Sequence, residues 1–326
     1  MDTLQQICKP IESDLQEFEV RLQEKLKSDV ELLDTVIHYV LQNQGKRFRP
    51  ILVLLTAQMT GKVTADSIHG AIMVELLHTA TLIHDDVVDE SDTRRGHPTI
   101  HKVWQNKVAI LTGDYLFAKA LISLVDVERL DAIRILSQAA TRMSEGELLQ
   151  IERRMDYKMN ESIYYKLVSD KTASLISAAC QLGAVTSSDR NNGDVTRKMS
   201  DFGEYLGIAF QIKDDLLDYT GDENKIGKPV AKDILENKIT LPLIYALKNS
   251  DQKQSEQIIK IINDSPSAKD IDTIRKYVIT HGGIDFAKDK ARQYADQAVN
   301  ILDAFPNSPY KASLNALSEF VMSRES

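Results

Sequence analysis

The sequence predicts an all-α protein, and three observations support this. Apolar residues recur at helical spacing, as in the runs from Ala71 to Leu82 and from Leu206 to Leu217. No segment alternates apolar and polar residues for long enough to predict a strand. Glycine and proline are sparse, at 14 and 8 residues, and they fall between the periodic segments. We therefore predict many helices of roughly 12 to 25 residues.

Short segments rich in Gly, Pro, Asn and Ser separate the predicted helices. One long helix is predicted from Asp66 to Asp89. None of the breaks resembles a flexible linker, so we expect a single domain over residues 1–326. The breaks are Asn43–Gly45, Thr60–Lys62, Gly96–Pro98, Ser187–Gly193, Gly221–Pro229, Asp264–Ser267 and Phe305–Pro309.

Composition narrows the class of protein. The 326 residues are 43% hydrophobic and 27% charged, and the net charge of −8 argues against a nucleic-acid partner. Residues 1–20 lack the apolar core of a signal peptide. The most apolar uncharged stretch, Pro50–Gly61, is too short to span a bilayer. Cys8 and Cys180 show no metal-ligand or redox spacing, which favours a cytoplasmic protein. Together with the short apolar stretch, we expect that the protein does not span a membrane.

Two aspartate clusters with the same D-D-x-x-D spacing lie 214 − 85 = 129 residues apart. The first begins at Asp85 and the second at Asp214. On a helix, residues four apart share a face, so each cluster presents two carboxylates side by side. That arrangement is unfavourable unless a cation offsets it. Each cluster also follows an apolar run, so the carboxylates are expected near a buried wall. A cation that binds few carboxylates and shares its other ligands with substrate phosphates would offset their charge, and Mg²⁺ is such a cation. The clusters are Asp85, Asp86 and Asp89, and Asp214, Asp215 and Asp218.

A single acidic patch of this kind is more often a solvated helix face or an N-cap. Two patches of identical spacing, both in apolar helices, are harder to explain in that way. The D-x-D-x-D-G loop of an EF-hand is absent, and so are a P-loop, a G-x-S-x-G motif and zinc-ligand spacing. The pair therefore indicates a metal and a phosphate-bearing ligand.

Basic and polar groups surround both clusters in the sequence. The turn Gly45–Pro50 carries three cations, which suits a diphosphate. Arg94 and Arg95 closely follow the first cluster, and His78 precedes Asp85 by seven residues. Each such residue alone is more often a solvated cation or a satisfied buried histidine. The remaining candidates are Lys171, Thr172, Gln211, Lys228 and Lys238.

At these residues the sequence resembles the trans-isoprenyl diphosphate synthase, or polyprenyl synthetase, family. The resemblance covers about Gly45 to Leu243. It implies an all-α bundle around a deep central cavity, usually dimeric, and a prenyltransferase that adds isopentenyl diphosphate to an allylic diphosphate by a head-to-tail linkage. The motifs are GKRFRP, LLHTATLIHDDVVDESDTRRGHPT, VAILTGDYL, DKTASL, GIAFQIKDDLLDY and GKPVAKDILENKITLPL.

The resemblance also implies roles for single residues. Asp85, Asp89 and Asp214 resemble Mg²⁺ ligands, and Asp86, Asp215 and Asp218 resemble groups beside the metal. The isopentenyl diphosphate site would comprise Lys46, Arg49, His78 and Arg95. The allylic diphosphate site would comprise Arg94, Lys171, Gln211, Lys228 and Lys238, with Thr172 beside the developing cation. The group expected to carry the reaction is Asp85, Asp86, Asp89, Arg94, Lys171, Gln211 and Asp214.

The last motif departs from the family pattern. Ala231 and Lys232 stand where the family often has Gly and Asp, and Asn237 stands where it has Gly. The roles of Lys228 and Lys238 depend on that loop. The implied chemistry needs no protein nucleophile, and the released diphosphate is the expected proton acceptor.

The residues that precede Asp85 on its helix bear on product length. In the family, large aromatic residues near the positions of Ala80 and Thr81 stop growth at short products. Small residues here predict a tunnel that stays open toward Leu77, Val74 and Met73. A helix from Asp66 to Asp89 is about 36 Å long, enough to flank about seven isoprene units of roughly 5 Å. This favours a product of about six to nine units, although small residues also serve close helix packing.

Three alternatives stay open at this stage. The chain could make a short product such as farnesyl or geranylgeranyl diphosphate. It could be a class I terpene cyclase, although such enzymes normally have a different second metal motif. It could also be a non-catalytic partner subunit, which would be free to lose one cluster. The expected partners are the two diphosphates, a second copy of the chain and a transient membrane contact for product release.

Overall fold

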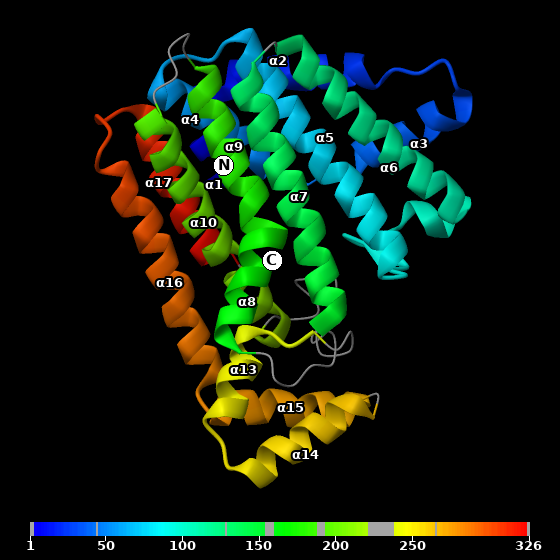
Figure 1. Ribbon diagram of the computed structural model, residues 1–326, viewed down its shortest axis with the longest axis vertical. Coiled ribbons are helices and arrows are strands. Elements are labelled where there is room, and N and C mark those ends of the chain that lie inside the picture. Colours follow the sequence, from blue (N-terminus) through cyan, green and yellow to red (C-terminus); the bar gives the residue numbers. More distant parts are fainter. Residues whose placement is uncertain are drawn as a thin grey trace. The chain divides into compact units, whose positions relative to one another are not determined.

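The prediction of an all-α protein is confirmed. The computed structural model describes residues 3–43, 45–127, 129–153, 160–187, 193–220, 238–264 and 266–324. Within these ranges the only strands form a two-stranded antiparallel hairpin of β1 (Thr93–Arg94) and β2 (His97–Pro98) (Figure 1). The chain divides into two compact units. Unit 1 comprises residues 1–140, 175–203 and 301–317, and unit 2 comprises residues 141–174, 204–300 and 318–326.

Unit 1 is built around α5 (Ala65–Val88). Helices α4 (Phe48–Thr60) and α5 pack side by side, α2 (Glu12–Leu26) contacts both, and α6 (Ile100–Val127) runs along α5. The other described helices that belong wholly or partly to this unit are α1 (Thr3–Cys8) with a 3₁₀ turn (Lys9–Ile11), α3 (Glu31–Gln42), α7 (Leu130–Arg153), α9 (Ser174–Thr186), α10 (Gly193–Thr220) and α17 (Pro309–Ser323).

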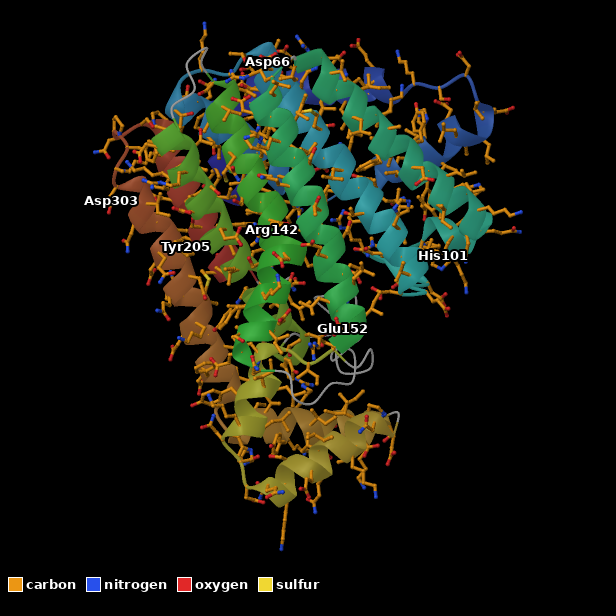
Figure 2. The ribbon with its side chains drawn as sticks, in the orientation of Figure 1. Asp66, His101, Arg142, Glu152, Tyr205 and Asp303 are labelled. Atoms are coloured by element: carbon orange, nitrogen blue, oxygen red, sulfur yellow. The ribbon has the colours of Figure 1, made fainter. Side chains whose placement is uncertain are left out.

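Helix α5 matches the helix predicted from Asp66 to Asp89 to within one residue at each end. It starts with a capping box, in which the side chains and backbone amides of Thr64 and Ser67 satisfy one another. Apolar residues on every side of the helix are buried in unit 1, which is typical of a central helix. In Figure 2, Asp66 and His101 mark where α5 begins and where the chain turns back into α6.

Helix α6 is interrupted at Gln105, whose backbone φ of 70° is not helical. Among the described helices it is the one that is long and apolar enough to cross a membrane. Its most apolar 18-residue window has a mean hydropathy of 1.7, and 35% of that window is buried inside the protein. Core helices of soluble proteins pass the same test, so length and composition alone are weak evidence for a span.

Unit 2 has its own apolar core, to which Tyr164, Ile212, Leu216, Leu241 and Ile274 contribute. Close helix approaches shape this core. A Cβ added to Gly283 would lie 2.2 Å from the carbonyl oxygen of Pro242, and the rings of Tyr245 and Phe286 stack at 4.1 Å. The further helices are α8 (Glu161–Val168), α13 (Leu241–Lys248), α14 (Gln252–Asn263), α15 (Ala268–Thr280) and α16 (Gly283–Leu302).

A five-residue π turn, Ser169–Ala173, joins α8 to α9. Such turns insert an extra residue into a helix and occur often at functional sites. This one contains Lys171 and Thr172, two of the residues that the sequence singled out.

Candidate active site

The first aspartate cluster lies at the C-terminal end of α5. Asp85 is in the last turn, and Asp89 is the cap residue, whose backbone amide donates to the carbonyl oxygen of Asp85 at 2.8 Å. A helix C-terminus carries partial negative charge, so acidic side chains are unfavourable there. A bound cation would relieve both this conflict and the repulsion between neighbouring carboxylates.

Asp86 differs from its two neighbours because it is buried, with 7% of its surface exposed. Nε of Arg94, in β1, lies 2.8 Å from one of its oxygens. The hairpin that follows turns at Arg95 and Gly96, which both have positive φ, of 52° and 79°. Two successive positive φ values are typical of a type I′ turn, and they are strained for an arginine. The strained turn thus directly follows Arg94, which pairs with Asp86, and the guanidinium of Arg95 lies against Gly45.

A group of cationic side chains lies close to His78. Burial lowers the pKa of Arg49 to about 10, with Arg95 adding to this and Glu75 opposing it. Nε of Arg49 is buried without a hydrogen-bond partner among the described residues. Burial also lowers the pKa of His78 well below its ordinary value, together with the charges of Arg49, Arg95 and Arg94. Buried cations with an unused donor suit an anionic ligand.

Gly45 makes room for this group. A Cβ at Gly45 would lie 2.5 Å from a terminal nitrogen of Arg95. Arg47, by contrast, is held by protein carboxylates, since it pairs with Glu19 at 2.8 Å and with Glu75 at 2.9 Å. Lys46 is exposed on the same turn. Of the three cations in this turn, Arg47 thus has a structural role.

The second cluster lies in the last two turns of α10. The side chain of Asp214 is 57% exposed, and Nη2 of Arg324 lies 3.2 Å from one of its oxygens. Arg324 also donates to the carbonyl oxygen of Phe210 at 2.9 Å, and its guanidinium lies 3.9 Å from the centre of the Phe210 ring. Asp218 is half-buried. The C-terminal segment thus offsets the charge of Asp214.

Asp215 is buried and connects three other side chains. Tyr164 donates to Oδ2 at 2.6 Å, and Gln211 donates to Oδ1 at 2.8 Å. The other end of the Gln211 amide accepts from Thr172 at 2.8 Å. Burial raises the pKa of Asp215 to about 7, with the charges of Asp214 and Asp218 adding to it and the two hydrogen bonds opposing it. This chain fixes the orientation of the Gln211 amide.

Lys171 is held by residues that the sequence analysis missed. Its Nζ lies 2.5 Å from Oε2 of Glu147 and 3.2 Å from Oε1 of Gln150, both on α7. A Cβ at Gly146 would lie 2.9 Å from the backbone nitrogen of Lys171, so the helix approaches the turn closely. A glycine inside a predicted helix, followed by Glu and Gln, was the signal that could have pointed to them.

A second missed contact involves the motif around Gly113. A Cβ there would lie 2.2 Å from Nε2 of His84, and this nitrogen lies 3.5 Å from a carboxylate oxygen of Asp114. His84 directly precedes the first cluster. The motif that contains Gly113 thus packs α6 against the cluster-bearing end of α5.

The remaining predicted residues fall into two groups. Met73, Val74, Leu77 and Ala80 are buried in unit 1, and the hydroxyl of Thr81 donates to the carbonyl oxygen of His78 at 2.9 Å. Lys238 is half-buried. Lys228 lies outside the described residues, as do Ala231, Lys232 and Asn237.

Comparison with known proteins gives consistent results. The family model described as "Polyprenyl synthetase" matches residues 30–278. Octaprenyl diphosphate synthase of Haemophilus influenzae is 33% identical over 324 residues, which are 99% of this chain and 97% of that protein. The structure of polyprenyl synthase from Caulobacter crescentus CB15, complexed with calcium and isoprenyl diphosphate, has a TM-score of 0.93 at 33% identity, covering 99% and 98% of the two chains. That of geranylgeranyl pyrophosphate synthase from Bacteroides thetaiotaomicron has a TM-score of 0.85 at 34% identity, covering 99% and 100%.

Proposed function

Because the chain belongs to the polyprenyl synthetase family and is a prenyltransferase, we propose that it joins isopentenyl diphosphate to an allylic diphosphate head to tail. The observation that carries this proposal is the position of the two aspartate clusters. Each lies at the C-terminal end of a helix with a buried apolar face, beside basic side chains. The family match includes residues of both units, which supports a single domain.

The isopentenyl diphosphate site comprises Lys46, Arg49, His78 and Arg95. Its support is the Nε of Arg49, which has no hydrogen-bond partner among the described residues, and the burial of His78 beside cationic side chains, which lowers the pKa of its imidazole. A neutral imidazole can donate one hydrogen bond to a phosphate oxygen, while the guanidinium groups supply the charge. An anion in this place would offset the cost of burying like charges together.

The allylic diphosphate site comprises Arg94, Lys171, Gln211, Lys228 and Lys238. Support comes from the way Lys171 and Gln211 are held, since each is fixed by two neighbouring side chains. Groups fixed in advance stabilise developing charge without reorganisation. The hydroxyl of Thr172 donates its hydrogen to Gln211, which leaves its lone pairs to stabilise a nearby carbocation.

Mg²⁺ is the proposed metal, with Asp85 and Asp89 at one cluster and Asp214 at the other. Within the described residues no three His, Cys, Asp or Glu side chains gather into a metal site. Mg²⁺ suits such clusters because it keeps water ligands and shares the rest with one or two carboxylates and substrate phosphates. When bound, it would supply charge stabilisation for the departing diphosphate.

In the proposed reaction the allylic carbon–oxygen bond breaks and diphosphate leaves. The double bond of isopentenyl diphosphate then provides the electron pair of the new carbon–carbon bond. The proton lost in forming the new double bond passes to the released diphosphate. Arg94 and Lys171 bind the leaving group, and Gln211 and Thr172 orient dipoles toward the cation. No protein nucleophile is needed.

A long-chain product of about six to nine units is the proposed outcome, formed along the face of α5 that carries Ala80, Leu77 and Val74. Small side chains at residues 80 and 81 support it, as does the octaprenyl product named for the relative from Haemophilus influenzae. The geranylgeranyl synthase among the similar structures represents the shorter alternative. Ala80→Phe should shorten the product while turnover persists, and an unchanged length would show that Ala80 is not near the growing chain.

A second copy of this chain is the proposed partner, and the exposed face of α6 is the proposed contact. Residues 110, 117 and 121 follow the interruption at Gln105, and their spacings of seven and four residues place them on one stripe of the helix. Water-exposed apolar stripes of this kind mark interaction sites. A homodimer in the cytoplasm would cover them. The exposed apolar residues of α6 are Val103, Ile110, Leu111, Phe117, Leu121, Ile122 and Val125.

The proposal is tested by replacing one aspartate of each cluster. Asp85→Ala and Asp214→Ala should each lower incorporation of labelled isopentenyl diphosphate by at least about a hundredfold. Each variant loses a carboxylate that would hold the metal, and the metal would stabilise the charge of the departing diphosphate. The exposed Asp272→Ala is the matched control and should leave the rate unchanged. Full activity in either cluster variant would contradict the assignment. Turnover of an allylic diphosphate without isopentenyl diphosphate would favour a terpene cyclase, and an inactive wild type would favour a non-catalytic subunit.

A further inference from the structure

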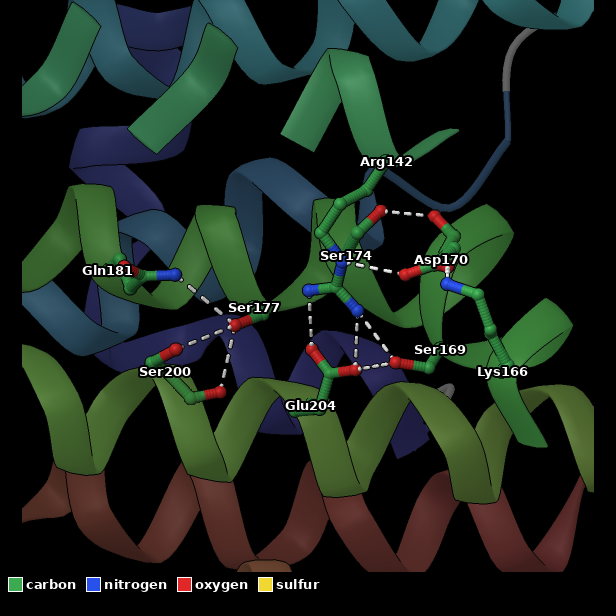
Figure 3. A network of polar contacts seen from close by, with 9 residues as sticks. All are labelled: Arg142, Lys166, Ser169, Asp170, Ser174, Ser177, Gln181, Ser200 and Glu204. Carbon is green, nitrogen blue, oxygen red and sulfur yellow. Dashed lines mark hydrogen bonds and ion pairs between the residues drawn. The ribbon is translucent and has the colours of Figure 1, made fainter. Parts of the chain in front are cut away.

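A network of charged and hydroxyl side chains surrounds the start of the π turn, outside the residues assigned to substrates (Figure 3). Arg142, labelled on α7 in Figure 2, reaches Asp170 of the turn and Glu204 of α10. Its Nε donates to Asp170 at 2.9 Å, and its terminal nitrogens donate to Glu204 at 2.9 and 3.1 Å. One guanidinium thus joins three elements of unit 2.

Two further side chains complete the network. Arg142 also donates to the hydroxyl of Ser169 at 2.6 Å, and that hydroxyl donates to Glu204. Lys166 lies 2.7 Å from the second oxygen of Asp170. Burial alone would raise the pKa of Asp170, but hydrogen bonds from Lys166 and Arg142 hold it below its ordinary value. The network therefore keeps a buried carboxylate ionised next to Lys171.

The two helices that Arg142 joins also carry the partners of Lys171 and Thr172. On α7, Arg142 and Gln150 are eight residues apart and lie on the same face, and Gln150 contacts Lys171. On α10, Glu204 and Gln211 are seven residues apart and share a face, and Gln211 contacts Thr172. The spacing between α7 and α10 thus determines where both side chains of the turn are held.

We propose that Arg142 is a positioning residue, which clamps the π turn between α7 and α10 and so aims Lys171 and Thr172 at the allylic diphosphate. The inference rests on the proposed function, because the substrate of these two residues is assigned there. Displacements of about 1 Å at a reacting centre can cost a hundredfold in rate. The predicted consequence is a loss specific to the allylic substrate.

A purely structural role would have a different signature. Removing Arg142 leaves Asp170 and Glu204 without their shared cation. This loss destabilises the fold whether or not the π turn is displaced. Arg142→Met combined with Glu204→Gln removes this imbalance, because Lys166 still pairs with Asp170. The double variant therefore separates stability from positioning. Arg292→Met is the matched control, since Arg292 pairs with Glu319 on the surface of the same unit at 2.8 Å.

The experiment measures KM and kcat for farnesyl diphosphate and for isopentenyl diphosphate in each variant. Arg142→Met should raise the KM for farnesyl diphosphate about tenfold or more, with that for isopentenyl diphosphate within twofold. The double variant should regain most of the lost Tm and keep the raised KM. Recovery of both the Tm and the KM for farnesyl diphosphate in the double variant would overturn the positioning role. An equal change in the KM values for the two substrates would also overturn it.

Amide hydrogen exchange of residues 169–173 gives a readout without turnover. Exchange in the double variant should be at least several-fold faster than in the wild type, and it should be unchanged in Arg292→Met. Equal exchange in the double variant and the wild type would overturn the proposal. An inactive wild type would instead contradict the proposed function, and the exchange rates would still decide whether Arg142 holds the turn.

Discussion

The phenolic oxygen of Tyr164 lies 2.6 Å from Oδ2 of Asp215, and both residues are buried in unit 2. The middle aspartate of the second cluster is thus bonded to the protein on both oxygens, because Gln211 donates to Oδ1. The first cluster has a similar arrangement, in which Asp86 is buried against Arg94. In each D-D-x-x-D motif the second residue anchors the helix end, and its neighbours are more exposed.

Tyr164→Phe should lower the free energy of unfolding by about 1–3 kcal/mol, because a buried carboxyl group loses its donor. Urea denaturation measures this loss. Tyr165→Phe is the matched control, since the hydroxyl of Tyr165 is buried without a hydrogen-bond partner among the described residues. Loss of the Tyr165 hydroxyl should leave the free energy of unfolding unchanged or raise it. Equal destabilisation by both variants would show that the Tyr164–Asp215 bond contributes little.

Gly45→Ala should raise the KM for isopentenyl diphosphate by about tenfold, because the added Cβ displaces the guanidinium of Arg95. Steady-state kinetics with varied isopentenyl diphosphate measures the effect. Gly193→Ala, at the start of α10, is the control, since a Cβ there meets nothing within 4 Å among the described residues. An unchanged KM in Gly45→Ala would place Arg95 outside the substrate site.

The aspartate clusters and α5 illustrate what the sequence could predict. Spacing and apolar runs are local signals, so they were sufficient to place the first cluster at the end of one long helix and to find the ends of that helix within one residue. The π turn and the strained φ of Arg95 have no such signal, because tertiary packing imposes them. Arg324 could not be linked to Asp214, since 110 residues separate them.

Stability should depend on pH through His78. Its pKa is lowered in the folded state, so below about pH 6.5 the unfolded chain binds a proton that the folded chain does not. The free energy of unfolding therefore falls as pH decreases, by up to about 1.4 kcal/mol per pH unit from this one group. Urea denaturation at pH 7 and pH 5.5 should show a smaller drop for His78→Gln. Equal drops in the wild type and in His78→Gln would contradict the prediction.

Leu111→Lys should dissociate the proposed dimer, because it places a charge in the exposed apolar face of α6. Light scattering after size exclusion measures the mass. Val20→Lys, an exposed apolar residue on α2, is the control and should leave the dimer intact. A monomeric wild type, or a dimer that survives Leu111→Lys, would show that this face is not the contact.

Side-chain partners were harder to predict than the residues themselves. Lys171 was found from its motif, but Glu147 and Gln150 were not, because nothing local links α7 to the π turn. Arg47 and Arg49 look alike in the turn, and only burial and the two acidic partners of Arg47 distinguish them. Such distinctions depend on contacts between helices far apart in the sequence.

The most direct test is the size of the product. The wild-type protein is incubated with Mg²⁺, farnesyl diphosphate and labelled isopentenyl diphosphate, and the extracted products are separated by chain length. We expect labelled polyprenyl diphosphates of about six to nine units, and no label transfer once Mg²⁺ is chelated. Products that stop at four units would contradict the long-chain assignment. Failure to incorporate isopentenyl diphosphate from any allylic primer would contradict the proposed function itself.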